Sequence, residues 1–264
     1  MTSVTKFWPI LTATHKYDKS ISTFNRGAGQ MIEAPILAYL IETKNGRILY
    51  DVGCDYHKIN NPIQRAKYYN PALSFGAPDM DESQRLPNQL AKMGLTPADI
   101  DIVFISHLHF DHAGGLCDIC GAEVHIQAEE LTNANATEDI AYFDNEIIAQ
   151  ANWQVKNGEY DLAPGVRAIA SPGHTAGHMS LWIEMPTGAP IILAGDAADL
   201  TENIVDEVAP GNCWQNQTEM AVASIRKLKY LAQAEKAALW PNHDMAFWRT
   251  INTLPIVDGV IVKI

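Results

Sequence analysis

The chain has 264 residues, of which 47% are hydrophobic and 19% are charged, and this is enough to bury the core of one sizeable domain. Its formal net charge of −12 argues against a nucleic-acid partner, because affinity for a phosphate backbone rests on lysine and arginine. The four cysteines are too few for a disulfide framework, and no apolar run approaches the roughly 18 residues of a membrane span, so no membrane association is expected.

The first half of the chain is expected to open with a β-hairpin. The N-terminal residues show no basic region followed by an apolar stretch, so we expect no signal peptide and a cytoplasmic location. Residues 35–43 and 46–53 are apolar, and they flank a short Lys-Asn-Gly turn, which predicts two antiparallel strands. The polar segment 55–82 is long for a loop, and such segments are often functional. We interpret it as a wall over a substrate, a surface excursion or a dimer contact.

Helical and extended patterns alternate in the rest of the chain. Leu86, Leu90 and Met93 recur at helical spacing, with Pro87 in the first turn and Gly94 at the end. Further helices are predicted over residues 138–150 and 217–234, and strands over residues 101–107, 122–127, 165–174, 178–185, 190–196 and 237–244. This order predicts two β-sheets with helices on their outer faces, an α/β sandwich formed by a single domain over residues 1–264.

The sequence SHLHFDHAGG, residues 106–115, carries most of the candidate chemistry. Residues two apart on an extended segment point to the same side, so His107 and His109 would direct two imidazoles to one place. Asp111 and His112 follow in a glycine-rich turn. Imidazole and carboxylate ligands at this spacing suit Zn²⁺ or a similar divalent metal. The alternative, a solvated polar strand end, accounts less well for four such residues directly after an apolar strand.

Three later strand ends each supply one more residue of a metal-binding type. These are His174 in SPGHTAGH, Asp196 in ILAGDAAD and His243 in WPNHD. Each follows an apolar run and lies near a residue that favours a loop, so the three side chains could converge at one rim of the sandwich. His178, which begins the next predicted strand, is interpreted as a structural residue that supports the site.

These motifs are similar in order and spacing to those of the metallo-β-lactamase superfamily. The similarity runs from YDVG through SHLHFDHAGG, SPGHTAGH and AGDAAD to PNHD, and with the preceding strand it covers residues 35–244. It implies the αββα sandwich of that superfamily, with two mixed β-sheets and helices on the outer faces. Within the superfamily, the stretches APILAYLIETKNGRILYDVGCD and NHDMAFW resemble the lactonase branch, which includes N-acyl homoserine lactonases and 4-pyridoxolactonases.

The resemblance implies seven ligands for two divalent metal ions. One ion would be held by His107, His109 and His174, the other by Asp111, His112 and His243, and Asp196 would bridge both. Zinc is the favoured metal, although histidine and aspartate also bind Mn, Fe and Co. Two neighbouring metals can share a hydroxide and lower the pKa of the water from which it forms.

The reaction implied is the hydrolytic opening of a lactone ring. A hydroxide that bridges the metals would attack the carbonyl carbon, one metal would polarise the carbonyl oxygen, and the other would accept the leaving alkoxide. Asp111 would be the catalytic residue that passes a proton to this alkoxide. The expected substrate is a neutral small molecule, an N-acyl homoserine lactone or a related lactone. With the former, the activity would be quorum quenching. The resemblance is also compatible with a homodimer.

One position departs from the lactonase pattern. Homoserine lactonases usually carry a tyrosine three residues after the bridging aspartate, where its hydroxyl helps to hold the substrate carbonyl. This chain has Asp199 there, and an ionised carboxylate cannot donate that hydrogen bond. The substrate could therefore differ, another donor could replace the tyrosine, or Asp199 could point away. We predict that Asp199 is neither a metal ligand nor essential.

Other functions on the same scaffold are alternatives. A thioesterase or carboxylesterase similar to glyoxalase II is the nearest, although those enzymes usually carry an additional basic C-terminal region. A non-haem iron oxidoreductase is less favoured, because a one-metal dioxygenase would leave the second set of ligands without a role. The Cys117-x-x-Cys120 pair has no partner pair, and we interpret it as packing or incidental.

Overall fold

The computed structural model describes residues 2–69, 75–143, 150–251, 256–257 and 260–261. Its helices are α1 Tyr56–Asn60, α2 Pro62–Tyr68, α3 Leu86–Lys92, α4 Phe110–Ala113, α5 Ala128–Ala136, α7 Thr201–Asp206, α8 Thr218–Glu235 and α9 Met245–Ile251. Its strands are β1 Val4–Asp18, β2 Met31–Thr43, β3 Gly46–Tyr50, β4 Ile102–Phe104, β5 Glu123–Gln127, β6 Asn152–Lys156, β7 Tyr160–Ala163, β8 Val166–Ala170, β9 Met179–Ile183, β10 Ile191–Leu193, β11 Ala238–Trp240, β12 Ile256–Val257 and β13 Val260–Ile261.

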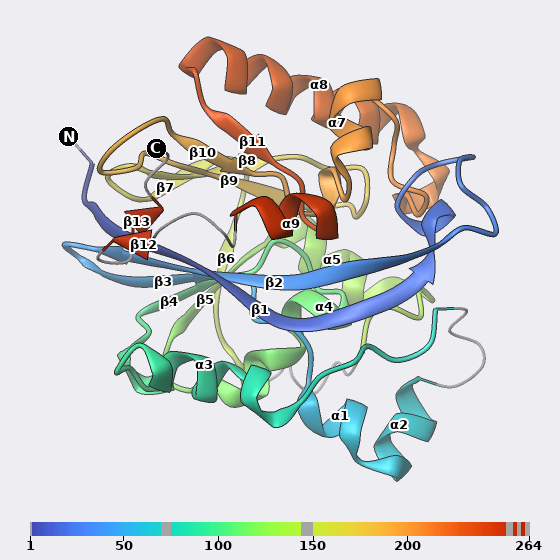
Figure 1. Cartoon of the computed structure of the whole chain (residues 1–264), viewed down its shortest axis with the longest axis horizontal. Helices are drawn as coiled ribbons and strands as arrows, with labels where there is room; N and C mark the ends of the chain where they lie inside the picture. Colours follow the sequence, from blue (N-terminus) through green and yellow to red (C-terminus); the bar gives the residue numbers. More distant parts are fainter. Residues whose placement is uncertain (1, 70–74, 144–149, 252–255, 258–259, 262–264) are drawn as a thin grey trace.

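Two mixed β-sheets face each other between layers of helices. The first sheet has the strand order β1-β2-β3-β4-β5-β6, and the second has the order β11-β10-β9-β8-β7. Figure 1 shows α7 and α8 outside the second sheet and α1, α2 and α3 outside the first. The expected αββα sandwich is therefore confirmed.

The first sheet begins antiparallel and continues parallel. β1 pairs with β2 and β2 with β3 in antiparallel register, whereas the pairs β3–β4, β4–β5 and β5–β6 are parallel. In the predicted hairpin, Thr43 pairs with Gly46, so Lys44 and Asn45 form a two-residue turn. Because β3 and β4 are parallel, both end at the same edge of the sheet, which is where the candidate ligands begin.

The apolar core lies between the two sheets. Phe7, Tyr39 and Phe104 from the first sheet pack with Leu181 and Trp240 from the second, and all five side chains are buried. Each sheet also buries its outer face. For example, Ile192 of β10 packs with buried side chains of α8. Burying one such aliphatic side chain contributes about 1.5–3 kcal/mol, so both faces favour this layered arrangement.

The helix predicted over residues 138–150 is wrong for residues 138–143, and residues 144–149 lie outside the described structure. Residues 138–143 form a turn, and α5 ends two residues before them, at Ala136. The long edge strand β1 was also not predicted. The expected strands that lead to the candidate ligands are confirmed, as β4, β8, β10 and β11.

No helix among the described residues is both long enough and apolar enough to cross a lipid bilayer.

Candidate metal centre

The histidine-rich motif begins directly after β4. Two residues separate the end of β4 from His107, and α4 then carries Asp111 and His112. The side chains of His107 and His112 are almost completely buried, and His109 is 6% exposed. Burial of so many polar rings is costly unless each ring has a partner, so this loop points to a bound group or an extensive hydrogen-bond network.

The remaining predicted ligands arrive from the second sheet. His174 follows β8, Asp196 follows β10, and His243 follows β11. Since β10 and β11 run parallel, Asp196 and His243 emerge at the same edge. The structure therefore brings together all the side chains that the sequence proposed as ligands.

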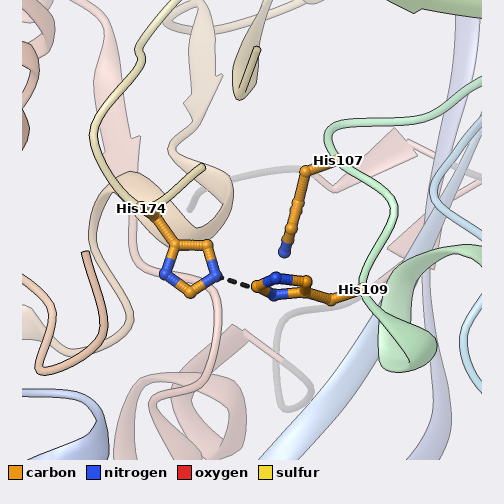
Figure 2. A group of neighbouring side chains, drawn as sticks. All are labelled: His107, His109 and His174. Atoms are coloured by element: carbon orange, nitrogen blue, oxygen red, sulfur yellow. Dashed lines mark hydrogen bonds between the residues drawn. The ribbon is translucent and has the colours of Figure 1, made fainter. Parts of the chain in front are cut away.

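These side chains form two groups of three. The first group is His107, His109 and His174, and the second is Asp111, His112 and His243. Within each group the potential ligand atoms lie within 4.8 Å of one another. Figure 2 shows the rings of the first group directed toward one another, with Nε2 of His174 3.0 Å from Nδ1 of His109.

Asp196 lies between the two groups and presents one carboxylate oxygen to each. Its Oδ2 is 3.4 Å from Nε2 of His174 and 3.7 Å from Nε2 of His107. Its Oδ1 is 3.1 Å from Nε2 of His243 and 3.3 Å from Nε2 of His112. A carboxylate in this position can contact two ions at once.

Hydrogen bonds on the outer side of the rings fix which nitrogen faces the centre. Nδ1 of His174 lies 3.0 Å from the carbonyl oxygen of Asn212, and Nδ1 of His243 lies 2.9 Å from that of Pro35. Because a carbonyl only accepts, each Nδ1 must carry the proton. The Nε2 lone pair then faces the centre, which is the arrangement that a metal-binding imidazole requires.

Asp51 performs the same task for His112 and was not singled out from the sequence. Its carboxylate lies 2.8 Å from Nδ1 of His112 and accepts hydrogen bonds from the backbone N–H and the hydroxyl of Ser106, at 2.7 and 2.8 Å. Asp51 is fully buried and has a positive φ of 55°. The available signal was an acidic residue directly after the apolar strand of the YDVG motif.

His178 supports Asp196. Its Nε2 accepts a hydrogen bond of 2.9 Å from the backbone N–H of Asp196, and its Nδ1 lies 2.9 Å from the hydroxyl of Ser171. A Cβ atom at Gly195 would lie 2.6 Å from both Nε2 of His178 and the hydroxyl of Tyr50. Only glycine fits this approach, so the turn that presents Asp196 depends on it.

Burial holds part of the centre neutral. It lowers the pKa of His174 to about 4 and the pKa of His107 well below its usual value. These imidazoles are therefore unprotonated at neutral pH, the form that binds metals. Burial also opposes protonation of His243, but the charge of Asp196 outweighs it and raises the pKa of His243 to about 10. The same negative charge favours bound cations.

The centre opens into a cavity of about 410 Å³. His109, Asp111, His174, Asp196 and His243 lie on its wall, which gives five of the predicted ligands access to a small molecule. Other parts of the wall are contributed by Tyr17, Phe75, Ile140, Asn212 and Cys213. The segment 55–82 thus reaches the cavity through Phe75, as expected if it forms a wall over a substrate.

Asp199 lies beside this centre. It is 4% exposed, lines the cavity, and could share an ion with Asp196 and His243 by distance alone. Burial, together with the charge of Asp196, raises the pKa of Asp199 to about 8. The structure therefore excludes an orientation of Asp199 away from the site.

The residues present fit two divalent metal ions. Among the described residues, Nε2 of His107 and Nε2 of His112 are buried and have no hydrogen-bond partner. Buried polar atoms of this kind are rare, and both are directed at the point where the oxygens of Asp196 lie. A set of imidazoles and carboxylates suits zinc and neighbouring transition metals.

Comparisons with known proteins point in the same direction. The sequence profile of the Metallo-beta-lactamase superfamily matches residues 32–243. An N-acyl homoserine lactonase from a Bacillus species is 33% identical over 229 residues, which cover 86% of this chain and 88% of the relative. The N-acyl homoserine lactonase AiiA from Bacillus thuringiensis subsp. kurstaki is 32% identical over the same shares of the two chains.

A solved structure shares the fold over almost its whole length. It is an N-acyl homoserine lactone hydrolase with the product N-hexanoyl-L-homoserine bound at the catalytic metal centre. The TM-score is 0.85 and the identity is 32%, over 95% of this chain and 97% of the other.

Proposed function

Since the chain belongs to the metallo-β-lactamase superfamily, we propose that it is a metal-dependent hydrolase that opens the ring of a lactone. The observation that carries the hydrolase proposal is the position of Asp196, with one carboxylate oxygen toward each group of three ligands. The named activity of the similar proteins supports the lactone as substrate.

Two divalent ions, with zinc favoured, would be held by the seven predicted ligands. His107, His109 and His174 would hold one ion, Asp111, His112 and His243 would hold the other, and Asp196 would contact both. When bound, the metals supply the Lewis acidity that activates water and polarises an ester carbonyl.

The protein side chains contribute orientation and proton transfer. The hydrogen bonds to Asn212 and Pro35 place the proton of each neutral ring on Nδ1 of His174 and His243, so that Nε2 is the atom directed at the centre. Asp111 lines the cavity with its Oδ2 3.7 Å from Nε2 of His243. From this position Asp111 would accept the proton of the attacking water oxygen and deliver it to the alkoxide oxygen released by the opening ring.

The cavity favours a neutral substrate with an apolar part. Asp111, Asp139 and Asp196 face it, so an anionic substrate would meet repulsion from their carboxylates. Phe75 and Ile140 form an apolar part of the wall, and Ile140 is half exposed. An N-acyl homoserine lactone, with a polar ring and an apolar chain, matches this division.

Metal analysis combined with a hydrolysis assay tests the proposal. We expect two metal ions per chain, and acid release in a pH-sensitive assay with N-acyl homoserine lactones of short and long chain, simple γ-lactones or 4-pyridoxolactone. A thioester and an aryl ester serve as controls for the glyoxalase II-like alternative.

Two metals with turnover of the thioester alone would retain the metal centre and overturn the lactonase assignment. A chain that binds a single metal after full loading would overturn the two-metal proposal. The single domain over residues 1–264, the cytoplasmic location, the absence of a nucleic-acid partner and the homodimer stay predictions.

A further inference from the structure

Helix α5 carries a buried acidic side chain that the proposed chemistry does not use. Glu130 lies in the first turn of α5 and has no exposed surface. An ionised carboxylate in such a place needs several hydrogen bonds, because burial removes it from water. Glu130 receives four, and they come from three separate segments of the chain.

One oxygen of Glu130 binds the segment that carries His107 and His109. Oε1 accepts a hydrogen bond of 2.9 Å from the backbone N–H of Leu108, the residue between these two histidines. The same oxygen accepts a hydrogen bond of 2.9 Å from the hydroxyl of Tyr142. The Tyr142 ring packs edge-on against His109, with ring centres 4.6 Å apart.

The other oxygen binds the segment that carries His174. Oε2 accepts a hydrogen bond of 2.6 Å from the hydroxyl of Thr175, the residue directly after His174. It accepts another, of 3.1 Å, from the backbone N–H of Gly177. A single carboxylate therefore connects two loops that are distant in sequence and that together supply the first group of ligands.

An independent feature shows how closely the second loop approaches α5. A Cβ atom built at Gly177 would lie 2.3 Å from the backbone nitrogen of Glu130 and 2.7 Å from its Cα atom. Contacts this short with backbone cannot be relieved by a side-chain rotation. The loop after His174 thus packs directly on the first turn of α5, and glycine at position 177 permits it.

We propose that Glu130 is the positioning residue of the first metal site, setting the distance and orientation of His109 relative to His174. This inference rests on the proposed metal centre. The nitrogens of His109 and His174 that face each other in Figure 2 are carried by the two loops that Glu130 connects. Glu130 binds no metal itself. It acts through the backbone of one loop and a side chain and backbone of the other.

The expected effect follows from the donors that would lose their acceptor. Leu108, Thr175 and Gly177 donate from buried positions, and an unsatisfied buried donor costs about 1–3 kcal/mol. The loops would shift to find other partners, and the ligands they carry would shift with them. Loss of a group that orients metal ligands typically weakens metal binding about 10- to 100-fold.

Glu130→Gln tests the inference, because it preserves size but turns one acceptor into a donor that faces other donors. The matched control is Glu129→Gln, which makes the same change at the exposed neighbouring residue. Metal release is followed by titration with a chelator of known affinity, and the wild type should release two ions in two steps. His174→Ala, which lacks a ligand of the first site, identifies the step that belongs to it.

We expect Glu130→Gln to weaken the first-site step about 10- to 100-fold and to leave the second-site step unchanged. Glu129→Gln should match the wild type in both. Thermal unfolding of the metal-free proteins provides a readout that does not depend on metal. If Glu130 served general stability alone, the metal-free variant would melt at a lower temperature while the affinities of the two sites fell together, and the inference would be overturned.

Failure of this inference is distinguishable from failure of the proposed function. If the wild type does not release its metal in two steps, the proposal of a two-metal centre is itself contradicted. A wild type with two steps, and a Glu130→Gln protein that matches the Glu129→Gln control, retains the centre and removes the positioning role. Gly177→Ala is a second perturbation of the same contact, and it should also weaken the first-site step selectively.

Discussion

At the scale of single residues, the centre depends on the direction in which each polar atom points. The backbone carbonyls of Asn212 and Pro35 take the outer nitrogens of His174 and His243, so the inner nitrogens remain available. Asp196 is held from two sides, by the ring of His178 and by the side-chain amide of Asn242 at 2.8 Å. These contacts order the ligands in advance, which reduces the entropy lost when a metal binds.

Asp199 provides the residue-scale prediction. It lies close to Asp196 and His243, but the two groups of three ligands and the bridging carboxylate already supply a full set for two ions. We expect Asp199→Asn to retain both metals and to change lactone turnover by less than about tenfold, equivalent to about 1.4 kcal/mol. Metal analysis and steady-state kinetics measure both. Loss of one metal, or of nearly all turnover, would show that Asp199 is a ligand or an essential group.

At the scale of elements, the helices differ in what they bury. α8 is amphipathic and packs Ile225 and Leu228 against the second sheet. α5 turns Glu130 and Ala134 inward: Ala134 joins the apolar cluster of the first sheet, whereas Glu130 binds the loops that carry candidate ligands. α8 therefore stabilises the sandwich, whereas α5 also organises the site.

A pair of substitutions in α8 tests this division. Leu228 is fully buried, so Leu228→Ala should lower the free energy of unfolding by about 2–5 kcal/mol through lost burial and a cavity. Tyr230 is 75% exposed on the same helix, and Tyr230→Ala should change the free energy of unfolding by less than about 0.5 kcal/mol. Urea unfolding of the metal-loaded proteins gives both values. Equal effects at the two positions would contradict the packing described for α8.

At the scale of the whole molecule, the centre joins the two sheets. Its ligands follow β4 of the first sheet and β8, β10 and β11 of the second. A bound ion is thus contacted by both halves of the sandwich, and in its absence the carboxylates of Asp111 and Asp196 add negative charge to a buried region. Metal binding should therefore be linked to global stability.

Metal removal tests this linkage. Anything that binds only the folded state stabilises it, by about 4 kcal/mol when the free ligand is a thousand times its dissociation constant. We expect the chelator-treated protein to unfold at a lower temperature than the loaded protein, and readdition of Zn²⁺ to restore the original value. Calorimetry measures the shift. Identical melting temperatures before and after removal would mean that the ions do not connect the two sheets.

The elements differ in how well their sequences predicted them, for physical reasons. Strands that lead to ligands are short, apolar and bounded by loop residues, so periodicity revealed them. β1 escaped prediction because it contains Pro9, which has no N–H for a ladder, and such a residue is tolerated there since β1 lies at the edge of its sheet. α5 escaped because its inner face mixes Glu130 with the small Ala134 and so shows no continuous apolar stripe.

The sequence by itself determined which residue types stand at the strand ends and therefore the metal chemistry available. Motif order also predicted the sandwich, because local spacing constrains where each strand stops. The tertiary structure alone decided how Asp196 divides its oxygens between the two groups, which ring nitrogens face inward, and that Asp51 and Glu130 hold the ligands. These features depend on contacts between residues far apart in the chain, such as Glu130 with Thr175 and His243 with Pro35. Local patterns carry no record of such contacts, because the distances are fixed only when the two sheets pack together.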